Sequence, residues 1–78
     1  MRGQRLIAEF NKNSMEIIKV NLQEWRGKKY VDIRIWVLQD PTDKATEIAT
    51  KKGITLNIEL LPELIKALVK AQKVLGED

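Results

Sequence analysis

The sequence contains no cysteine and no histidine. Without cysteine it has no disulfides and no thiolate metal sites, which suits a reducing compartment. Without histidine it lacks the commonest general base and the commonest metal ligand. The acidic residues before position 50 show no paired-carboxylate or Asp-x-Asp spacing. We therefore expect a protein that is not an enzyme, with no catalytic residues, no metal site and no cofactor.

Long apolar runs are also missing. Near the amino end only Leu6, Ile7 and Ala8 precede Glu9, which is too short for a signal sequence or a membrane span. There is no repeat and no low-complexity tract. We expect no membrane association and a cytoplasmic, nucleoid-associated location.

What the sequence does contain is typical of one small globular domain. Its 78 residues are 44% hydrophobic and 32% charged. A chain of this length builds a marginal core, and dimerisation is a natural remedy. We expect a single domain over residues 1–78 that forms a homodimer.

Positive charge is unevenly distributed along the chain. The net charge is +3, and residues 1–52 hold eleven Lys or Arg against seven acidic residues, whereas residues 53–78 hold three against four. A basic excess confined to the first two thirds fits a phosphate-facing surface, although a modest excess is also common on solvated surfaces.

Hydrophobic periodicity predicts an α+β fold with four strands followed by one helix. Alternation with a period of two predicts strands over residues 5–11, 15–25, 29–38 and 53–58. Residues 39–52 are polar and predict a long loop. Apolar residues at helical spacing after Pro62, with Gly76 as a stop, predict a helix over residues 61–75.

The second and third strands are predicted to form a hairpin. A two-residue Gly27-Lys28 loop of type II′ would pair Arg26 with Lys29. Trp25 then lies opposite Tyr30, and Lys19 lies opposite Trp36. Polar and apolar residues alternate in both strands, and this register places the polar residues of the two strands on the same face.

A four-stranded sheet has two faces, and one helix can cover only one of them. The apolar face around Val20 and Ile33 is the expected site for the helix. The uncovered face would then present aromatic and basic residues, a combination that suits stacking of bases and neutralisation of phosphates. This face carries Lys19, Asn21, Trp25, Tyr30, Arg34 and Trp36, and the adjoining hairpin turn adds Arg26 and Lys28.

Structural interpretations of the same residues remain open. Trp25 and Tyr30 could be a cross-strand packing pair, and Trp36 over Lys19 could be a simple cation–π contact. Arg34 could be paired with Asp32 or Glu16.

Two linked segments resemble a known family. The run EWRGKKYVDIRIW at residues 24–36 and KKGITL at 51–56 resemble the single-stranded DNA-binding domain of the transcriptional coactivator positive cofactor four and its bacterial homologues. The resemblance covers roughly residues 7–71. It implies four antiparallel strands in a curved sheet, a C-terminal helix that forms the homodimer interface, and basic channels for single-stranded DNA.

The resemblance also assigns roles to individual residues. Trp25 takes the position of the family's hairpin aromatic, and Arg34 that of its strand arginine. Lys51 and Lys52 match the basic pair before the glycine, and they enter the predicted site through the resemblance. Trp36 lies one residue earlier than the corresponding tryptophan of the archetype, so its place in the site rests on its sharing a face with Arg34.

From this sequence we expect a homodimeric single-stranded DNA-binding protein with little sequence specificity, supporting transcription, replication or repair. Two alternatives remain. One is a module that binds single-stranded RNA with the same face, and the other is a protein-interaction scaffold that uses the aromatic residues.

Overall fold

A computed structural model describes residues 2–77 of the chain. Residues 1 and 78, the outer bounds of the predicted domain, lie outside the described residues. The elements in chain order are β1 (Arg2–Asn11), β2 (Glu16–Trp25), β3 (Lys28–Leu38), a 3₁₀ turn η1 (Lys44–Thr46), β4 (Glu47–Asn57), a second 3₁₀ turn η2 (Ile58–Leu60) and the helix α1 (Leu61–Glu77).

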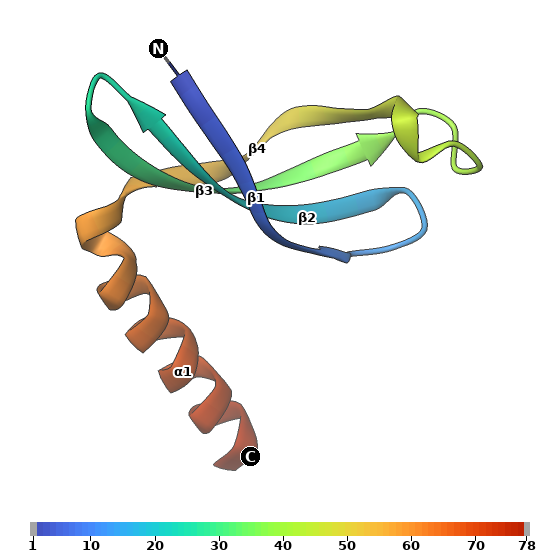
Figure 1. The fold of residues 1–78 in the computed structure, drawn as a ribbon. Coiled ribbons are helices and arrows are strands. Elements are labelled where there is room, and N and C mark those ends of the chain that lie inside the picture. Colours follow the sequence, from blue (N-terminus) through green and yellow to red (C-terminus); the bar gives the residue numbers. More distant parts are fainter. Residues whose placement is uncertain (1, 78) are drawn as a thin grey trace.

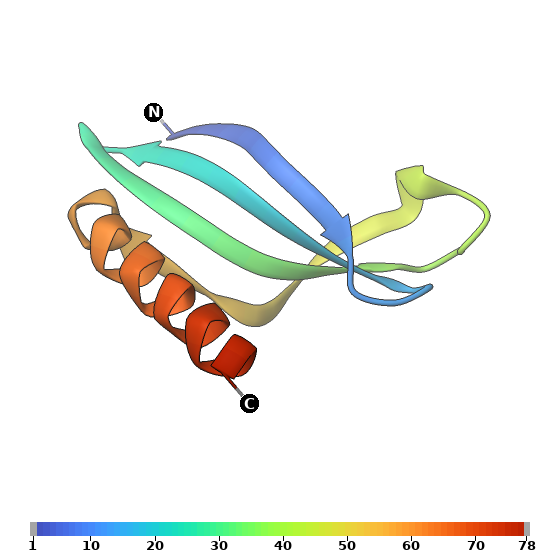
Figure 2. The ribbon, with the colours of Figure 1, turned by 90° about the horizontal axis from the view of Figure 1, so that it is seen from below.

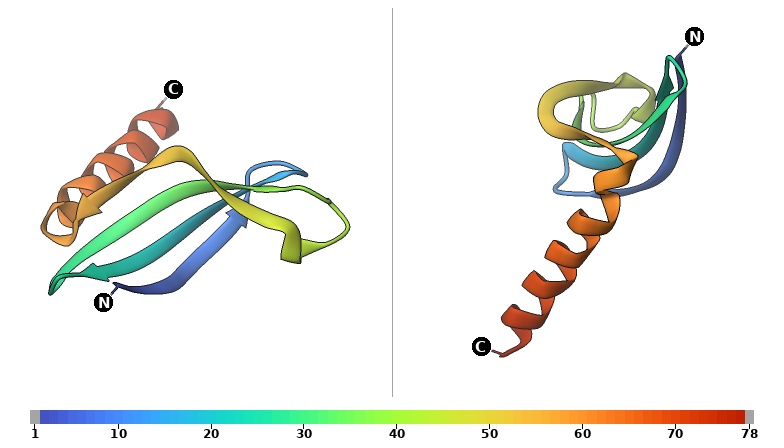
Figure 3. Two further views of the ribbon diagram at one scale, coloured as in Figure 1. Left: turned by 90° about the horizontal axis from the view of Figure 1, so that it is seen from above. Right: turned by 90° about the vertical axis from the view of Figure 1, so that its left-hand side faces the viewer.

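The four strands form one antiparallel sheet in the order β1-β2-β3-β4, so each strand pairs with its neighbour in sequence (Figure 1). The sheet is strongly curled, as the two views of Figure 3 show. The predicted four-stranded antiparallel curved sheet with one C-terminal helix is confirmed.

The sheet has a polar face and an apolar face. On β2 and β3 the polar face carries Lys19, Asn21, Trp25, Tyr30, Asp32, Arg34 and Trp36, and the apolar face carries Ile18, Val20, Leu22, Val31, Ile33 and Ile35. Because directly opposed residues in antiparallel strands point to the same side, the pairing of alternating sequences fixes both faces.

The β2–β3 turn differs from the prediction. The two loop residues are Arg26 and Gly27, with φ of 52° and 76°, and Trp25 pairs with Lys28. Positive φ at both central residues is the type I′ geometry, whose twist matches that of the strands, and Gly27 supports it without steric cost. The predicted Gly27-Lys28 loop is therefore wrong.

The corrected turn shifts every predicted β2–β3 pair by two residues. Lys19 lies opposite Arg34, and Gln23 lies opposite Tyr30. A shift of two preserves the side to which each residue points, so the predicted face assignments on these strands survive the error.

The predicted loop 39–52 is too long, because β4 begins at Glu47 and not at residue 53. Glu47 pairs with Leu38, and Ile48 pairs with Val37. The connection is shortened by η1, where the Asp43 carboxylate accepts a hydrogen bond from the Ala45 backbone N–H at 2.9 Å. An edge strand with polar residues lacks the apolar run that signals a strand in sequence.

Within β4, a bulge separates two regular stretches. Arg34 pairs with Gly53, but two residues further along β3 Trp36 pairs with Ala49, so β4 carries extra residues between these points. The bulge places Lys51 and Lys52 at the sheet edge. At Gly53 the strands approach so closely that an added Cβ would lie 2.7 Å from the Arg34 Cα.

The helix α1 projects away from the sheet (Figures 1 and 3). It lies on the β4 side of the sheet in Figure 2. None of its residues is buried, so the prediction that the helix covers the apolar face is wrong. The short turn η2 directs the helix outward and does not fold it back onto the sheet. The helix also continues through Gly76, the predicted stop, and ends at Glu77.

This arrangement leaves two apolar surfaces exposed, the apolar face of the sheet and the apolar side of the helix. Phe10 and Ile54 on the sheet are 57% and 47% exposed, and Leu68 and Leu75 on the helix are 59% and 73% exposed. No helix among residues 2–77 is long and apolar enough to cross a membrane.

We predict that Gly53→Ala destabilises the protein by about 1–3 kcal/mol, because the new methyl group meets β3 backbone and forces the strands apart. Gly3→Ala is the matched control, since nothing lies within 4 Å of a Cβ at Gly3. Urea unfolding at one protein concentration measures both. A Gly53→Ala protein as stable as the parent would show that β4 does not approach β3 this closely.

Candidate nucleic-acid interface

One end of the polar face holds an aromatic hollow. It has a volume of about 350 Å³ and is lined by Gln23, Trp25, Tyr30 and Thr55. Trp25 is 48% exposed, and the guanidinium carbon of Arg26 lies 4.5 Å from the centroid of its ring. Because Trp25 is the last residue of β2 and Arg26 begins the turn, the type I′ geometry places the cation over the ring.

Arg34 is held in place by a network of hydrogen bonds. Its Nη2 donates to Asp32 Oδ1 at 2.9 Å, its Nε lies 3.2 Å from Asp32 Oδ2, and its Nη1 donates to the Thr50 carbonyl at 3.0 Å. The Thr55 hydroxyl in turn donates to Asp32 Oδ1 at 2.7 Å. Asp32 is only 3% exposed, so its charge is compensated inside the protein by Arg34.

This network fastens the β4 bulge. Thr50 precedes Lys51 and Lys52, Thr55 follows them, and Arg34 donates to both threonines, at 3.0 and 3.3 Å. The Thr50 hydroxyl also accepts from the Lys52 backbone N–H at 3.1 Å. Arg34 therefore positions the two lysines as well as contributing its own charge.

Lys19 belongs to a second internal cluster. It is 8% exposed, donates a hydrogen bond to the Glu47 carboxylate, and lies 3.9 Å from Glu9 Oε2. Its ammonium is also 4.5 Å from the centroid of the Trp36 ring. Lys19 thus joins β1, β2 and β4. Of the three structural interpretations raised by the sequence, Trp36 over Lys19 and Arg34 with Asp32 are present. Trp25 and Tyr30 are not a directly opposed pair, because Tyr30 lies opposite Gln23.

Glu9 extends this cluster to the η1 turn. Lys44 Nζ donates to Glu9 Oε1 at 3.0 Å. This hydrogen bond is the largest cause that lowers the pKa of Glu9 below its usual 4.5, and the charges of Lys19 and Lys44 act in the same direction. The same bond raises the pKa of Lys44.

The cations of the polar face and its edges therefore fall into two groups. Lys19 and Arg34 are compensated by carboxylates. The other four predicted cations are exposed, and none makes an ion pair with another described residue: Arg26, Lys28, Lys51 and Lys52. The structure thus places compensated charge on the floor of the face and uncompensated charge at its rim, on the hairpin turn and the β4 bulge. Lys52 also borders a hollow on the apolar side of the sheet, beside Ile33 and Ile54.

The ten predicted site residues do not form one uniform surface. Trp25, Arg26, Lys28 and Tyr30 lie together at the hairpin end, whereas Lys19 and Trp36 lie toward the other end. Asn21, between these two groups on β2, is only 3% exposed. Arg34 and the Lys51-Lys52 pair lie beside the bulge.

Several buried polar atoms of the face have no hydrogen-bond partner among the described residues. They are Glu9 Oε2, Asn21 Nδ2, Trp36 Nε1 and Glu47 Oε2. Native proteins leave few buried polar groups unpaired, so each one calls for an explanation.

Sequence reasoning named Asp32 as a possible partner of Arg34 but missed the other residues that organise the site. Asp32, Thr50 and Thr55 hold Arg34, and Glu9 and Glu47 hold Lys19. Only Asp32 had a usable signal, because an Asp-x-Arg spacing in a strand puts both side chains on one face. The other partners come from distant strands.

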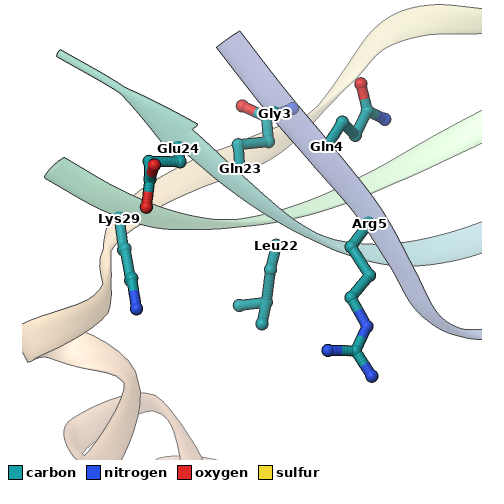
Figure 4. A pocket seen from close by; sticks show the side chains of 7 residues that line it. All are labelled: Gly3, Gln4, Arg5, Leu22, Gln23, Glu24 and Lys29. Atoms are coloured by element: carbon teal, nitrogen blue, oxygen red, sulfur yellow. The ribbon is translucent and has the colours of Figure 1, made fainter. Parts of the chain in front are cut away.

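A second hollow, of about 340 Å³, lies at the β1–β2–β3 end of the sheet (Figure 4). Arg5, Leu22 and Lys29 point to the same side, which is the side of the helix. Basic side chains thus also border the apolar face.

We predict that Glu9→Gln lowers the unfolding temperature at pH 7 by about 1–6 °C, because it removes the negative charge that pairs with Lys44 and Lys19. A carboxylate whose folded pKa is lowered contributes stability above its unfolded pKa and loses it as the pH falls. The gap between parent and variant should therefore close as the pH drops below 4.5, the usual pKa of this group. Thermal scans across this range measure it, and a gap that persists in acid would contradict the pairing.

The model of the family described as Transcriptional Coactivator p15 (PC4) matches residues 12–67. The search of curated proteins found no match.

Solved structures of homologues share the fold. The PC4 homologue of Burkholderia pseudomallei K96243 in its orthorhombic crystal form has 31% identity and a TM-score of 0.76, over 87% of this chain and 88% of the homologue. Its tetragonal form gives 30% identity and a TM-score of 0.77, over 90% and 98%. The bacteriophage T5 homologue of the eukaryotic coactivator PC4 gives 26% identity and a TM-score of 0.64, over 95% and 85%. The chain belongs to the PC4 family, as its hairpin and Lys-Lys-Gly motifs predicted.

Proposed function

We propose that this protein binds single-stranded DNA with little sequence specificity, across the polar face, as a homodimer. The observation that carries the proposal is the pairing of an exposed aromatic hollow at Trp25 and Tyr30 with rim cations that have no acidic partner among the described residues. Aromatic rings stack on any base, and lysine and arginine neutralise phosphates, so the two together favour a flexible single strand.

The geometry suggests how a strand is held. Bases stack in the hollow, where Trp25 offers one ring face while Arg26 covers the other or gives way to a base. Phosphates follow the rim from Arg26 and Lys28 to the Lys51-Lys52 bulge. On the floor of the face, the charges of Lys19 and Arg34 are paired with carboxylates, so the floor attracts phosphate only weakly. This arrangement favours a strand whose bases point toward the sheet and whose backbone points away from it.

The comparisons support a role with DNA. The family is described as a transcriptional coactivator, and the bacteriophage T5 homologue is described as implicated in recombination-dependent DNA replication. We infer a supporting role in transcription, replication or repair, in the cytoplasm with the nucleoid. An RNA strand offers the same stacking and phosphate contacts, so it remains an outcome of the test.

The homodimer part of the proposal rests on surfaces that one chain leaves uncovered. The helix exposes a stripe that includes Ile65, Leu68 and Leu75, and the sheet exposes Ile54. Contiguous exposed apolar surface of this kind is typical of an interface. Pairing of α1 with α1 of a second copy would cover it and supply the core that so short a chain lacks.

We predict that oligo-dT quenches tryptophan fluorescence and that the affinity falls steeply with salt. Changing Lys51 and Lys52 to Ala should weaken binding and reduce the slope of log K against log salt by about 0.7–1 per lysine, because fewer counterions are released. Fluorescence titrations at several salt concentrations measure this slope.

Lys70→Ala is the control, since it removes one exposed helix charge and should leave the slope unchanged. Duplex DNA should bind more weakly than the single strand. The proposal fails if oligo-dT leaves the fluorescence unchanged at low salt with micromolar protein. Tighter binding to matched RNA would instead assign the face to RNA.

We predict that Leu68→Glu converts a dimer to a monomer, because it places a charge in the apolar stripe of α1. Sedimentation velocity at micromolar protein measures the change. Lys70→Glu introduces the same carboxylate about 200° around the helix from Leu68 and should remain dimeric. A parent protein that sediments as a monomer would refute the homodimer.

A further inference from the structure

Arg26 has an unusual backbone conformation for its residue type. It is the first residue of the two-residue turn between β2 and β3, and its φ is 52°. Among residues 2–77 it is the one residue other than glycine with a positive φ. Most side chains disfavour this left-handed region, which glycine, asparagine and aspartate tolerate best. The fold therefore holds an arginine where a smaller residue would be less strained.

This conformation determines where the Arg26 side chain lies. Successive residues of an extended strand point to opposite faces of the sheet, so a continued strand would direct Arg26 away from Trp25. In the left-handed conformation the chain turns instead, and the guanidinium carbon of Arg26 lies 4.5 Å from the centroid of the Trp25 ring. The strained turn thus brings a planar cation against the ring of the preceding residue.

No carboxylate competes for the guanidinium. Arg26 is exposed and makes no ion pair with another described residue. Strained backbone conformations cluster at functional sites, where the strain is part of how the site works. The turn itself does not require an arginine, so the contact with Trp25 is the feature that gives this strain a role.

The contact leaves the hollow beside Trp25 open. The aromatic hollow is lined by Gln23, Trp25, Tyr30 and Thr55, and Arg26 is not among these residues. The guanidinium therefore covers a part of the indole that does not border the hollow. A base that enters the hollow can stack on Trp25 without displacing Arg26.

We propose that Arg26 is a positioning residue for base stacking, because its guanidinium holds the Trp25 indole in one orientation beside the hollow. This inference rests on the binding of single strands to the polar face. Trp25 is the last residue of β2 and is 48% exposed, so packing alone leaves its side chain room to move. A ring that is already held in the free protein need not be ordered on binding, which is worth a factor of about two to ten in affinity.

The first test removes the planar guanidinium but keeps its charge. Arg26→Lys has the same charge and the same strained turn, but a compact and strongly hydrated ammonium stacks less well on an indole. Fluorescence titration with oligo-dT should show binding about two- to tenfold weaker than that of the parent. The slope of log K against log salt should stay the same, because the number of cations available to phosphate is unchanged.

Lys28→Ala is the matched control. Lys28 lies directly opposite Trp25 across the hairpin, so this variant removes a charge beside the same turn and leaves the contact between Arg26 and Trp25 in place. It should reduce the salt slope by about 0.7–1. The NMR order parameter of the Trp25 indole N–H in the free protein should fall in Arg26→Lys and keep the parent value in Lys28→Ala.

Arg26→Asn separates a role in binding from a role in the fold. Asparagine followed by glycine is a preferred pair in a type I′ turn. This variant should therefore unfold at a temperature at least as high as that of the parent, and yet bind oligo-dT more weakly. A loss of affinity without a loss of stability does not come from a damaged hairpin.

Parent affinity in Arg26→Lys would overturn the positioning role while leaving single-strand binding intact. An unchanged order parameter of the Trp25 indole in that variant would overturn it too. Failure of the parent itself to bind oligo-dT would instead refute the proposed function, and this inference with it.

Discussion

The bond between Arg34 and Asp32 organises the polar face. Asp32 is almost completely buried, and a buried carboxylate without a partner would be strongly destabilising. Arg34 neutralises it and, with the same guanidinium, reaches Thr50 and Thr55 on β4. Removing either partner would therefore disturb more than one charge, since the β4 bulge that carries Lys51 and Lys52 would lose one of its anchors to β3.

A consequence is that formal charge and available charge differ on this sheet. Lys19 and Arg34 are cations in the sequence, but carboxylates compensate them in the structure. Lys28, Lys51 and Lys52 are exposed and make no ion pair with another described residue. A floor of hydrogen-bonding groups inside a basic rim suits a strand whose bases face the sheet, because the attraction for phosphate lies outside.

The direction of the helix is the second constraint on the molecule. A chain of 78 residues that leaves Leu68 and Ile54 exposed has not completed its core by itself. A second copy would bury both surfaces without covering the polar face, since α1 leaves the sheet on the other side (Figures 1 and 4). Assembly and ligand binding can therefore use opposite faces of one sheet.

Much of the fold could be predicted from the sequence, because strict alternation in β2 and β3 fixes which residues share a face. The hairpin loop could not be placed to the residue: Gly27 is compatible with either two-residue loop, and the two registers differ by two positions. The strand at Glu47 was missed because a polar edge strand has no apolar signal.

The candidate site was harder to predict than the fold. The resemblance added Lys51 and Lys52 to the predicted site. Lys19 is paired with Glu9 and Glu47, and these two partners lie on other strands. Their contact depends on register and curvature, which local patterns do not encode. The sequence predicts that the helix covers the sheet, because the helix has one apolar stripe and the sheet has one apolar face. A single sequence does not show whether such a face is covered by the same chain or by a second copy.

The most direct test of the central claim is NMR with labelled indole and methyl groups during titration with oligo-dT. Binding across the polar face predicts that the Trp25 indole and the Thr55 methyl signals shift, while the Ile33 methyl signal on the apolar face stays in place. Shifts at Ile33 without any at Trp25 and Thr55 would contradict the account, because they would place the strand on the opposite face.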